Sequence, residues 1–460
     1  MRAATTLLGI GLGAIGLAQG YFSPEERQTI AQYWDTPDRY VRGFVPDHPT
    51  LGSWRARPTC EGSTWLHKYY KTRTGNAKVI PGQPPAPVTE RQKVWDAWID
   101  LRYNRDVFLA ESKAREENEK ELGRALATPL PKDAVDPGAI PPDLKDLVGA
   151  PPVFSKALQP GHHTINFHDG KVLSYSDNIA TRAKYAYLRF ADGVMSGGTR
   201  VRTMPKSELD QLLRRAGINE SEARVFAAVS LLEGGFDSLN TYDTGFVSVG
   251  FIQFASLTAG AGSLGQVLLR HKTLHPNEFQ RDFRHFGLDV SPIGQLVALD
   301  IDTGIEAVGP DANLVIIRDK RLAAVFQRAG QISTPFRVCQ LIIAKESYYP
   351  ADIPLSVSVN GKTYSGRVRD VFRTEAGIAT LMDRKVNTGK LGDLNERLAQ
   401  VMDYYAFNSL AEASQAEYQL VRMLKYREDY LDDVALSRPR DLSVELSRRG
   451  SRSGNRTPPP

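Results

Sequence analysis

A glutamate at the end of an apolar helix is the feature of the sequence that best fits a catalytic role. Asn219 and Glu222 have the spacing of a capping box, which predicts that a helix starts there. Apolar residues recur at helical spacing over 225–232, so we expect one face of this helix to be buried. The glycine pair at 234–235 should end the helix. Glu233 is therefore expected at its C-terminal end.

That position favours a raised pKa for the Glu233 carboxyl group. The C-terminus of a helix carries partial negative charge, and apolar surroundings penalise an ionised carboxylate. A carboxylic acid that stays protonated near neutral pH is what cleavage of a glycosidic bond requires of its general acid. The alternative is a surface glutamate that closes a helix whose end is solvated.

A polar element inside the apolar run 246–254 is the second chemical feature. Gln253 is flanked by apolar residues, and a buried amide must find hydrogen-bond partners. It either ties neighbouring backbone together or lines a groove and holds a sugar amide or hydroxyl. Ser248 and Gly250 are small, and Gly250 permits close approach of backbone or ligand.

Glu233 followed by the phrase Ser248-Val249-Gly250-Phe251-Ile252-Gln253 resembles the lysozyme-like superfamily. Its soluble lytic transglycosylases and goose-type lysozymes have a Ser-x-Gly-x-x-Gln element about twenty residues after a catalytic Glu, and phage-type peptidoglycan hydrolases are similar. The resemblance covers about residues 219–390 and implies a mainly α (α+β) lysozyme-like helical domain with short β-hairpins. By resemblance, Glu233 is the acid, while Ser248, Gly250 and Gln253 shape the glycan groove.

Two departures leave the subfamily open. Gly234 stands where the transglycosylases usually have Ser, and Ile252 stands where they usually have Met. The attacking group is therefore either water or the 6-hydroxyl of the sugar itself.

A second carboxylate would decide between these reactions. The loop after Glu233 offers Asp237 and Asp243, and Asp243, next to the candidate substrate-binding residue Tyr242, is the preferred water-activating base. An inverting hydrolase needs its two carboxyl groups roughly 6.5–9.5 Å apart. Alternatively, both aspartates organise the loop through bonds to the backbone. If neither aspartate acts as a base, the transglycosylase reaction is favoured over hydrolysis, because it can run on one Glu.

Other candidate residues carry weaker signals. His162, His163 and His168 lie close together, but the strand alternation places His163 and His168 on opposite faces, so no metal or cofactor is expected. Glu346 has no Ser-x-Gly-x-x-Gln element after it and is interpreted as structural or as a groove edge. Glu375 opens a helix, whose positive end disfavours an acid role.

The charge of the chain is concentrated in its C-terminal tail. The formal net charge is +5, and residues 437–460 hold six arginines against two acidic residues. This Ser-, Arg- and Pro-rich tail is predicted to be disordered and is a candidate to contact anionic wall polymers. No nucleic-acid-binding motif accompanies it, so nucleic acid is not an expected partner.

The first residues have the pattern of an export signal. Arg2 precedes an apolar stretch over 7–18, and Gly16, Ala18 and Gly20 offer small residues for cleavage. An uncleaved anchor or a buried N-terminal helix is the alternative. Cys60 and Cys339 are interpreted as free thiols, although one disulfide would be compatible with an exported chain.

The sequence thus predicts a secreted or periplasmic enzyme that cleaves β-1,4 bonds of peptidoglycan or a related amino-sugar polymer such as chitosan. The alternative is a non-catalytic envelope protein that binds wall glycan through a lysozyme-like groove. The predicted organisation is a signal peptide (1–20), a mostly helical region (21–127), a Pro-rich linker (128–161), a β-hairpin segment (162–203), a lysozyme-like catalytic domain (204–430) and a basic disordered tail (431–460). Helices are expected over 23–40, 88–127, 207–216, 370–387 and 394–426, hairpins over 163–175 and 355–368, and irregular packed structure over 41–87.

Overall fold

The computed structural model covers most of the predicted helices and hairpins. The described residues are 20–45, 48, 51–74, 88–126, 134–177, 188–230, 234–425, 430, 431 and 436. Within them the chain is mainly helical with small antiparallel sheets, so the predicted α+β class is confirmed. None of the helices in these ranges combines the length and the apolar character that crossing a bilayer requires. Residues 1–19 of the predicted signal peptide lie outside the described residues.

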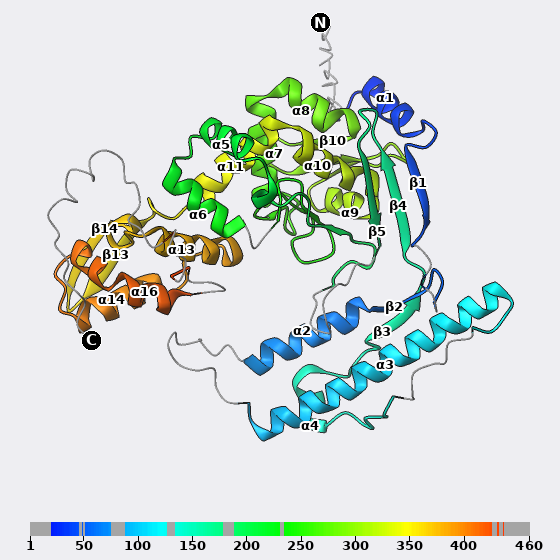
Figure 1. Cartoon of the computed structure of the whole chain (residues 1–460), viewed down its shortest axis with the longest axis horizontal. Helices are drawn as coiled ribbons and strands as arrows, with labels where there is room; N and C mark the ends of the chain where they lie inside the picture. The colour runs from blue at the N-terminus through cyan, green and yellow to red at the C-terminus, as the bar shows by residue number, and fades with distance from the viewer. Residues whose placement is uncertain are drawn as a thin grey trace, which may run out of the picture.

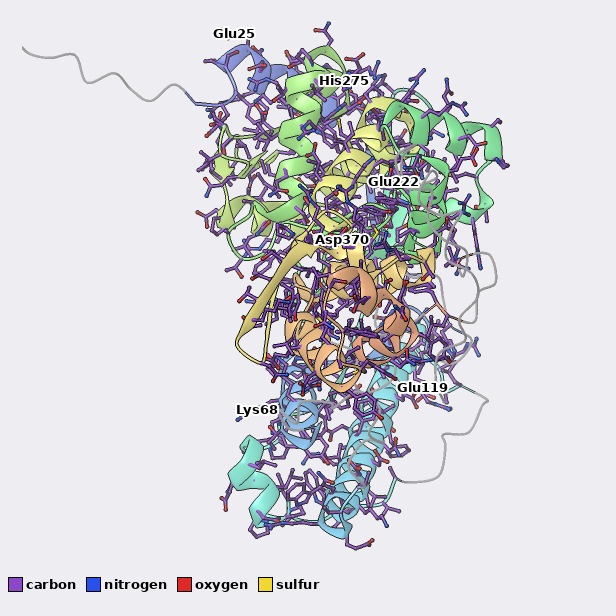
Figure 2. All side chains as sticks on the ribbon, turned by 90° about the vertical axis from the view of Figure 1, so that its left-hand side faces the viewer. Glu25, Lys68, Glu119, Glu222, His275 and Asp370 are labelled. Atoms are coloured by element: carbon purple, nitrogen blue, oxygen red, sulfur yellow. The ribbon has the colours of Figure 1, made fainter. Side chains whose placement is uncertain are left out.

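A helical arm with its own hydrophobic core projects from the body of the molecule (Figure 1). The arm consists of α2 (Cys60–Thr74), α3 (Glu90–Leu122), α4 (Pro142–Val148) and the antiparallel strands β2 (Arg55–Pro58) and β3 (Ser155–Leu158). Trp65, Trp98 and Phe154 are buried in its core. Burial of a large apolar side chain such as Phe154 contributes roughly 1.5–3 kcal/mol. In Figure 2, Lys68 and Glu119 mark the arm below the body.

Two predictions for this region are wrong. The range 41–87, expected to be irregular, contains the 15-residue helix α2. The range 128–161, expected to be a linker or an extended wrapping segment, contains the helix α4 and contributes its Leu144 and Val148 to the core of the arm. The prolines that indicated a linker have another local role. Pro142 occupies the first turn of α4, where its missing amide hydrogen has no intrahelical partner to lose.

A three-stranded antiparallel sheet joins the N-terminal residues to the body. Its strands are β1 (Tyr40–Phe44), β4 (Gly161–Asn166) and β5 (Val172–Ser176), and β4 and β5 form the predicted hairpin. Helix α1 (Pro24–Trp34) begins at a capping box of Ser23 and Glu26. The indole nitrogen of Trp34 donates to the carbonyl of Phe286, 3.1 Å away. The predicted boundary at residue 204 is therefore not a boundary of the hydrophobic core, which residues on both sides of it share.

The body is organised around the buried helix α10 (Lys320–Ile332). Every residue from Lys320 to Gly330 is buried, which is typical of a helix enclosed on all sides. It packs against α8 (Pro276–Asp282), α9 (Pro310–Arg318), α11 (Thr334–Tyr348) and the strands β4 and β5. The body also contains α7 (Gly262–Leu274), the 3-10 turn η2 (Arg284–Phe286) and the sheet of β10 (Leu288–Val290), β11 (Leu296–Leu299) and β12 (Glu306–Val308). The buried charge of Arg328 is paired with Asp169 at 2.9 Å.

A small antiparallel sheet follows helix α6 (Glu220–Ser230) in the chain. Its strands, in the order β6-β7-β8-β9, are β6 (Met195–Ser196), β7 (Leu239–Asn240), β8 (Ser248–Val249) and β9 (Phe254–Ala255). The turn η1 (Val201–Thr203) and helix α5 (Lys206–Arg215) precede α6, and α5 matches the helix predicted over 207–216. The chain therefore leaves α6, passes position 233 and enters this sheet.

The C-terminal part of the body contains the second predicted hairpin. Strands β13 (Pro354–Val359) and β14 (Lys362–Arg367) pair through a turn at Asn360 and Gly361, both with positive φ. The helices that follow are α12 (Val368–Val371), α13 (Glu375–Thr388), α14 (Leu394–Tyr404), α15 (Leu410–Ala413), the 3-10 turn η3 (Ser414–Ala416) and α16 (Glu417–Leu424).

Two C-terminal predictions need correction. The single helix expected over 394–426 is divided, because Ala406 adopts a positive φ just after α14. The tail expected to be disordered from 431 includes a packed residue, since Leu436 is buried and its carbonyl accepts a hydrogen bond from the amide of Ala376. The arginines of the tail, from 438 onward, lie outside the described residues.

Replacement of Glu375 by Gln is expected to lower the free energy of unfolding by about 3 kcal/mol. Glu375 is 0 % exposed and accepts three hydrogen bonds from Nε and Nη2 of Arg224, at 2.6, 2.8 and 3.1 Å, so its neutralisation removes a counter-charge from a largely buried guanidinium. The matched control is Glu346→Gln. Glu346 forms a similar two-bond pair with Arg270 but is 52 % exposed, and its loss should cost less than about 1 kcal/mol. Urea unfolding followed by circular dichroism measures both; equal losses would contradict the expectation.

Candidate functional site

Helix α6 leads toward Glu233 and starts at the predicted capping box. Asn219 Oδ1 accepts a hydrogen bond from the amide of Glu222 at 2.9 Å, and Glu222 Oε2 accepts one from the amide of Asn219 at 3.1 Å. Val225 and Val229 are buried, which confirms the apolar stripe over the described part of the helix. Glu233 itself lies outside the described residues, as do residues 231 and 232.

Gly234, directly after Glu233, lies beside a polar cluster formed by Ser238, Gly250 and Gln253. The Ser238 hydroxyl donates to the carbonyl of Gly250 at 2.7 Å. The Gln253 amide nitrogen donates to the Ser238 hydroxyl at 2.6 Å and to the Gly250 carbonyl at 3.2 Å. A Cβ atom at position 234 would lie 3.1 Å from the Ser238 hydroxyl. The fold therefore brings Gln253 close to the residue that follows Glu233.

The structural role considered for Gln253 is confirmed, and its contact with a sugar stays a prediction. Its side chain ties the turn before β9 to Ser238, a partner that sequence reasoning did not identify because nothing in its neighbourhood singles it out. Gly250 has a φ of +88°, and a side chain there would overlap Gln340 Oε1 of α11. The close approach expected at Gly250 is thus made by Gln340, whose amide nitrogen also donates to the carbonyl of Phe236 at 2.9 Å.

Asp237 is a buried residue that fastens the loop to the body. It is 2 % exposed and accepts hydrogen bonds from the amide of Thr199 at 2.7 Å and from Gln331 Nε2 at 3.0 Å. Burial raises the pKa of the nearby Tyr175 hydroxyl, and the negative charge of Asp237 adds to this effect. These contacts favour the interpretation of Asp237 as an organiser of the loop.

Asp243 organises the turn between β7 and β8. Its Oδ2 accepts from Asn240 Nδ2 at 2.8 Å, and its Oδ1 accepts from the amide of Gly245 at 2.8 Å. The amide of Tyr242 donates to Asn240 Oδ1 at 3.0 Å, which closes the same network. Both oxygens of Asp243 thus have partners inside the loop, which favours the alternative that Asp243 organises the loop. Ser248, the remaining predicted groove residue, is buried in β8 and packs against Gly245.

An open pocket of about 360 Å³ borders the loop after Glu233. It is lined by Lys171, Thr199, Thr203, Met204, Pro205, Glu208, Phe236, Asp237, Gly330, Gln331 and Arg337. Its volume is within the range of small-molecule sites. Glu208 and Arg337 form an ion pair at its rim, and Arg337 also donates to the carbonyl of Gly330 at 2.6 Å. Sequence reasoning missed both residues, since they lie 129 positions apart on different helices.

The histidines of the predicted hairpin have separate partners, and the two cysteines are unpaired with each other. His163 is buried, with the Tyr40 hydroxyl at 2.7 Å and Asp177 at 2.9 Å, whereas His168 is near the Tyr33 hydroxyl. Across the described ranges, no three His, Cys, Asp or Glu side chains gather in a way that could hold a metal ion. Cys60 and Cys339 are free thiols, as interpreted from the sequence. Burial raises the pKa of the Cys339 thiol to about 12.

Comparison with protein-family models, with curated proteins and with solved structures gives no match.

Replacement of Gly330 by Ala is expected to disturb the candidate site through packing alone. A methyl group at this position would overlap the carbonyl oxygen of Phe236 and lie 2.5 Å from the Cα atom of Asp237. Gly330 is helical, so alanine adds no backbone strain, and the overpacking should cost about 1–3 kcal/mol of unfolding free energy. Gly43→Ala is the control, because a methyl group there meets nothing within 4 Å. Thermal unfolding by circular dichroism compares them, and an unchanged Gly330→Ala protein would refute the close packing.

Proposed function

We propose that this chain is an exported enzyme that cleaves β-1,4 glycosidic bonds of peptidoglycan, with Glu233 as the general acid. The observation that carries the proposal is the position of Gly234. The residue next to Glu233 lies against the polar cluster of Ser238, Gly250 and Gln253. The loop that contains it also borders an open pocket through Phe236 and Asp237. A buried helix, a Glu and then a small antiparallel sheet with the Ser-x-Gly-x-x-Gln element is the order that the lysozyme-like resemblance implies.

The proposed reaction begins with proton transfer from Glu233 to the bridging oxygen. The bond between that oxygen and C1 of the sugar breaks, the leaving sugar keeps the proton as a hydroxyl group, and positive charge develops at C1 and the ring oxygen. In a hydrolase, water then adds to C1 and loses a proton to a base. In a transglycosylase, the 6-hydroxyl of the same sugar adds to C1 and returns its proton to Glu233, which leaves an anhydro ring.

The contacts of the two aspartates favour the second route. Asp237 and Asp243 are the carboxylates that the sequence offers as a water-activating base, and each already accepts hydrogen bonds from a backbone amide and a side-chain amide. A base held in this way would weaken those bonds when it takes up the proton of the water molecule. A reaction that runs on Glu233 alone makes no such demand.

The same observation supports a second candidate function. A non-catalytic envelope protein that binds wall glycan has no need of a free second carboxylate, and the pocket bordered by Asp237 would serve it equally well. The two candidates differ in whether the position-233 carboxyl group donates a proton.

Glu233→Gln is expected to reduce the release of soluble fragments from purified peptidoglycan by at least about 100-fold, because the amide cannot protonate the leaving oxygen. The experiment uses the chain without residues 1–20 and identifies the products by mass spectrometry. Glu220→Gln is the matched control, an exposed glutamate at the start of the same helix, and should cleave like the wild type. If wild type and both variants bind peptidoglycan or chitosan without cutting it, the binding function replaces the enzymatic one.

Asp243→Asn is expected to keep activity within about tenfold of the wild type and to yield anhydro products. In the proposed route Asp243 only organises its loop, and asparagine keeps an oxygen that can accept from the amide of Gly245. A general base contributes about 10²–10⁴-fold to a rate. A loss of that size in a folded Asp243→Asn protein, together with reducing-end products from the wild type, would assign the hydrolase reaction instead.

A further inference from the structure

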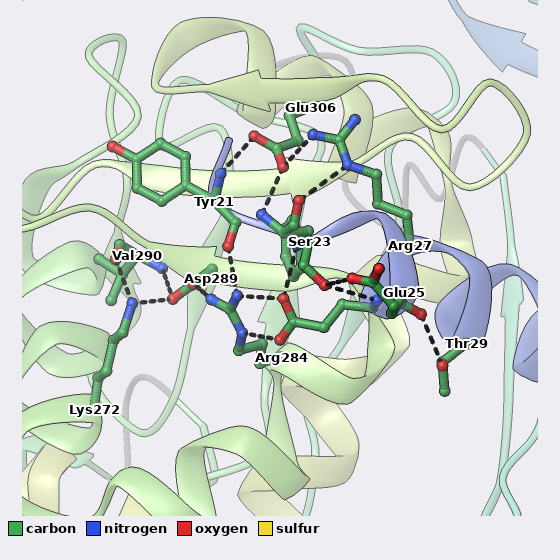
Figure 3. A network of polar contacts seen from close by, with 12 residues as sticks. Tyr21, Ser23, Glu25, Arg27, Thr29, Lys272, Arg284, Asp289, Val290 and Glu306 are labelled. Atoms are coloured by element: carbon green, nitrogen blue, oxygen red, sulfur yellow. Dashed lines mark hydrogen bonds and ion pairs between the residues drawn. The ribbon is translucent and has the colours of Figure 1, made fainter. Parts of the chain in front are cut away.

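A carboxylate from the body holds the first residues of the described chain (Figure 3). Glu306 Oε2 accepts a hydrogen bond from the nitrogen of Tyr21 at 2.9 Å, and Glu306 Oε1 accepts one from the amide of Phe22 at 2.6 Å. The Glu306 side chain is only 12 % exposed and belongs to β12, which follows in the sequence 285 residues after Tyr21. Such long-range binding by a nearly buried carboxylate makes this a specific site for the segment.

Carboxylates and cations surround this segment (Figure 3). Glu306 pairs with Arg27 at 2.7 Å, and Arg284 pairs with Glu26 at 2.7 Å. The remaining members are Glu25, Asp289 and Lys272. A positive charge on the nitrogen of Tyr21 would face a carboxylate directly, since this nitrogen lies 2.9 Å from Glu306 Oε2.

The sequence just before Tyr21 provides the source of that charge. Ala18 and Gly20 are the small residues at the third and first positions before the Gly20–Tyr21 bond, a pattern that signal peptidases cut. A Cβ atom at position 20 would lie 2.6 Å from Arg27 Nη2 and 2.9 Å from Glu306 Oε1, so a larger residue there would displace the ends of these two side chains. Glycine lets both side chains keep their places.

We propose that a signal peptidase hydrolyses the Gly20–Tyr21 bond and that Glu306 binds the new α-ammonium group of Tyr21. Water adds across the amide bond, so that Gly20 leaves with the leader as a carboxylate and the Tyr21 nitrogen becomes a charged amine. The hydrogen bond to Glu306 then changes from a neutral amide donor to a charged one, and charge-assisted bonds are roughly twice as strong. The proposal rests on the predicted export signal but uses no residue of the glycan pocket.

The first test is the N-terminal sequence of the full chain after export from a secreting host. The expected first residue is Tyr21. A mature protein that begins at Leu17 or Gln19, as cleavage after Gly16 or Ala18 would give, overturns the proposal. A protein that retains Met1 overturns it as well. Loss of glycan cleavage would change none of these results, so the two proposals fail independently.

The second test separates the charge of the ammonium group from other effects of truncation. Proteins that begin at Tyr21 or at Ala18 are each made with Glu306 and with Glu306→Gln. An open depression of about 680 Å³, lined in part by residues 20–24 and Arg284, borders the start of this segment. At pH 6, the Tyr21 protein should melt about 1–4 °C above the Ala18 protein, and Glu306→Gln should abolish that difference. A difference that survives in Glu306→Gln overturns the binding of the ammonium group.

The pH dependence of the same difference gives a further check. Pairing with a carboxylate raises the pKa of an α-amino group above its ordinary value of about 7.7–8.0. The stabilisation is therefore complete below that ordinary value and is lost as the pH rises through the raised pKa of the folded protein. The other charged groups around this nitrogen are Arg27, Arg284 and Lys272 and the carboxylates of Glu26, Asp289 and Glu306. The melting difference should disappear by about pH 10, and a constant difference from pH 6 to pH 10 would contradict the proposal.

Discussion

The packing of one loop against one glycine of the central helix is the constraint on which the candidate site depends. The backbone of Phe236 and Asp237 reaches Gly330 of α10 so closely that no side chain fits between them. Helix α10 is enclosed on all sides and cannot shift without disturbing the core, so the loop takes its position from the helix. Gln331, the next residue of α10, donates to Asp237 and fixes the loop further. The placement of residue 234 beside the polar cluster follows from this contact.

Structural features that depend on residues close together in the sequence, such as helix caps and hairpins, were predictable. The capping box of Asn219 and Glu222 forms as expected, because its two hydrogen bonds join residues three apart. The hairpins over 163–175 and 355–368 form because alternating strands flank a turn that glycine permits. The partners of the site residues were not predictable in this way. Gln253 bonds to Ser238, which is 15 positions earlier in the chain. Gly250 contacts Gln340 because α11 packs against this part of the chain.

Burial explains most of the differences between expectation and structure. Prolines over 128–161 indicated a linker, but a residue such as Leu144 becomes core when α3 passes beside it, and no local pattern records that neighbour. Glu375 was expected to open a helix and to be a poor acid; its full burial, with bonds from Ser221 and Arg224 of α6, was not expected. The carboxylate thereby joins α13 to the helix that leads to Glu233. Local sequence identifies such a side chain as charged but not as buried, since burial depends on a helix about 150 residues earlier.

The separate core of the arm determines which part of the molecule dominates its intrinsic tryptophan fluorescence. The chain has five tryptophans, and only Trp34 is buried in the body. The others belong to the arm or lie against it: Trp54, Trp65, Trp95 and Trp98. Intrinsic fluorescence of the native protein therefore reports mainly on the arm, which contains no residue of the candidate site. A change in the fluorescence spectrum on addition of glycan would therefore indicate a change in the arm. Binding in the pocket would alter the spectrum little unless it changed the surroundings of Trp34, which bonds to Phe286.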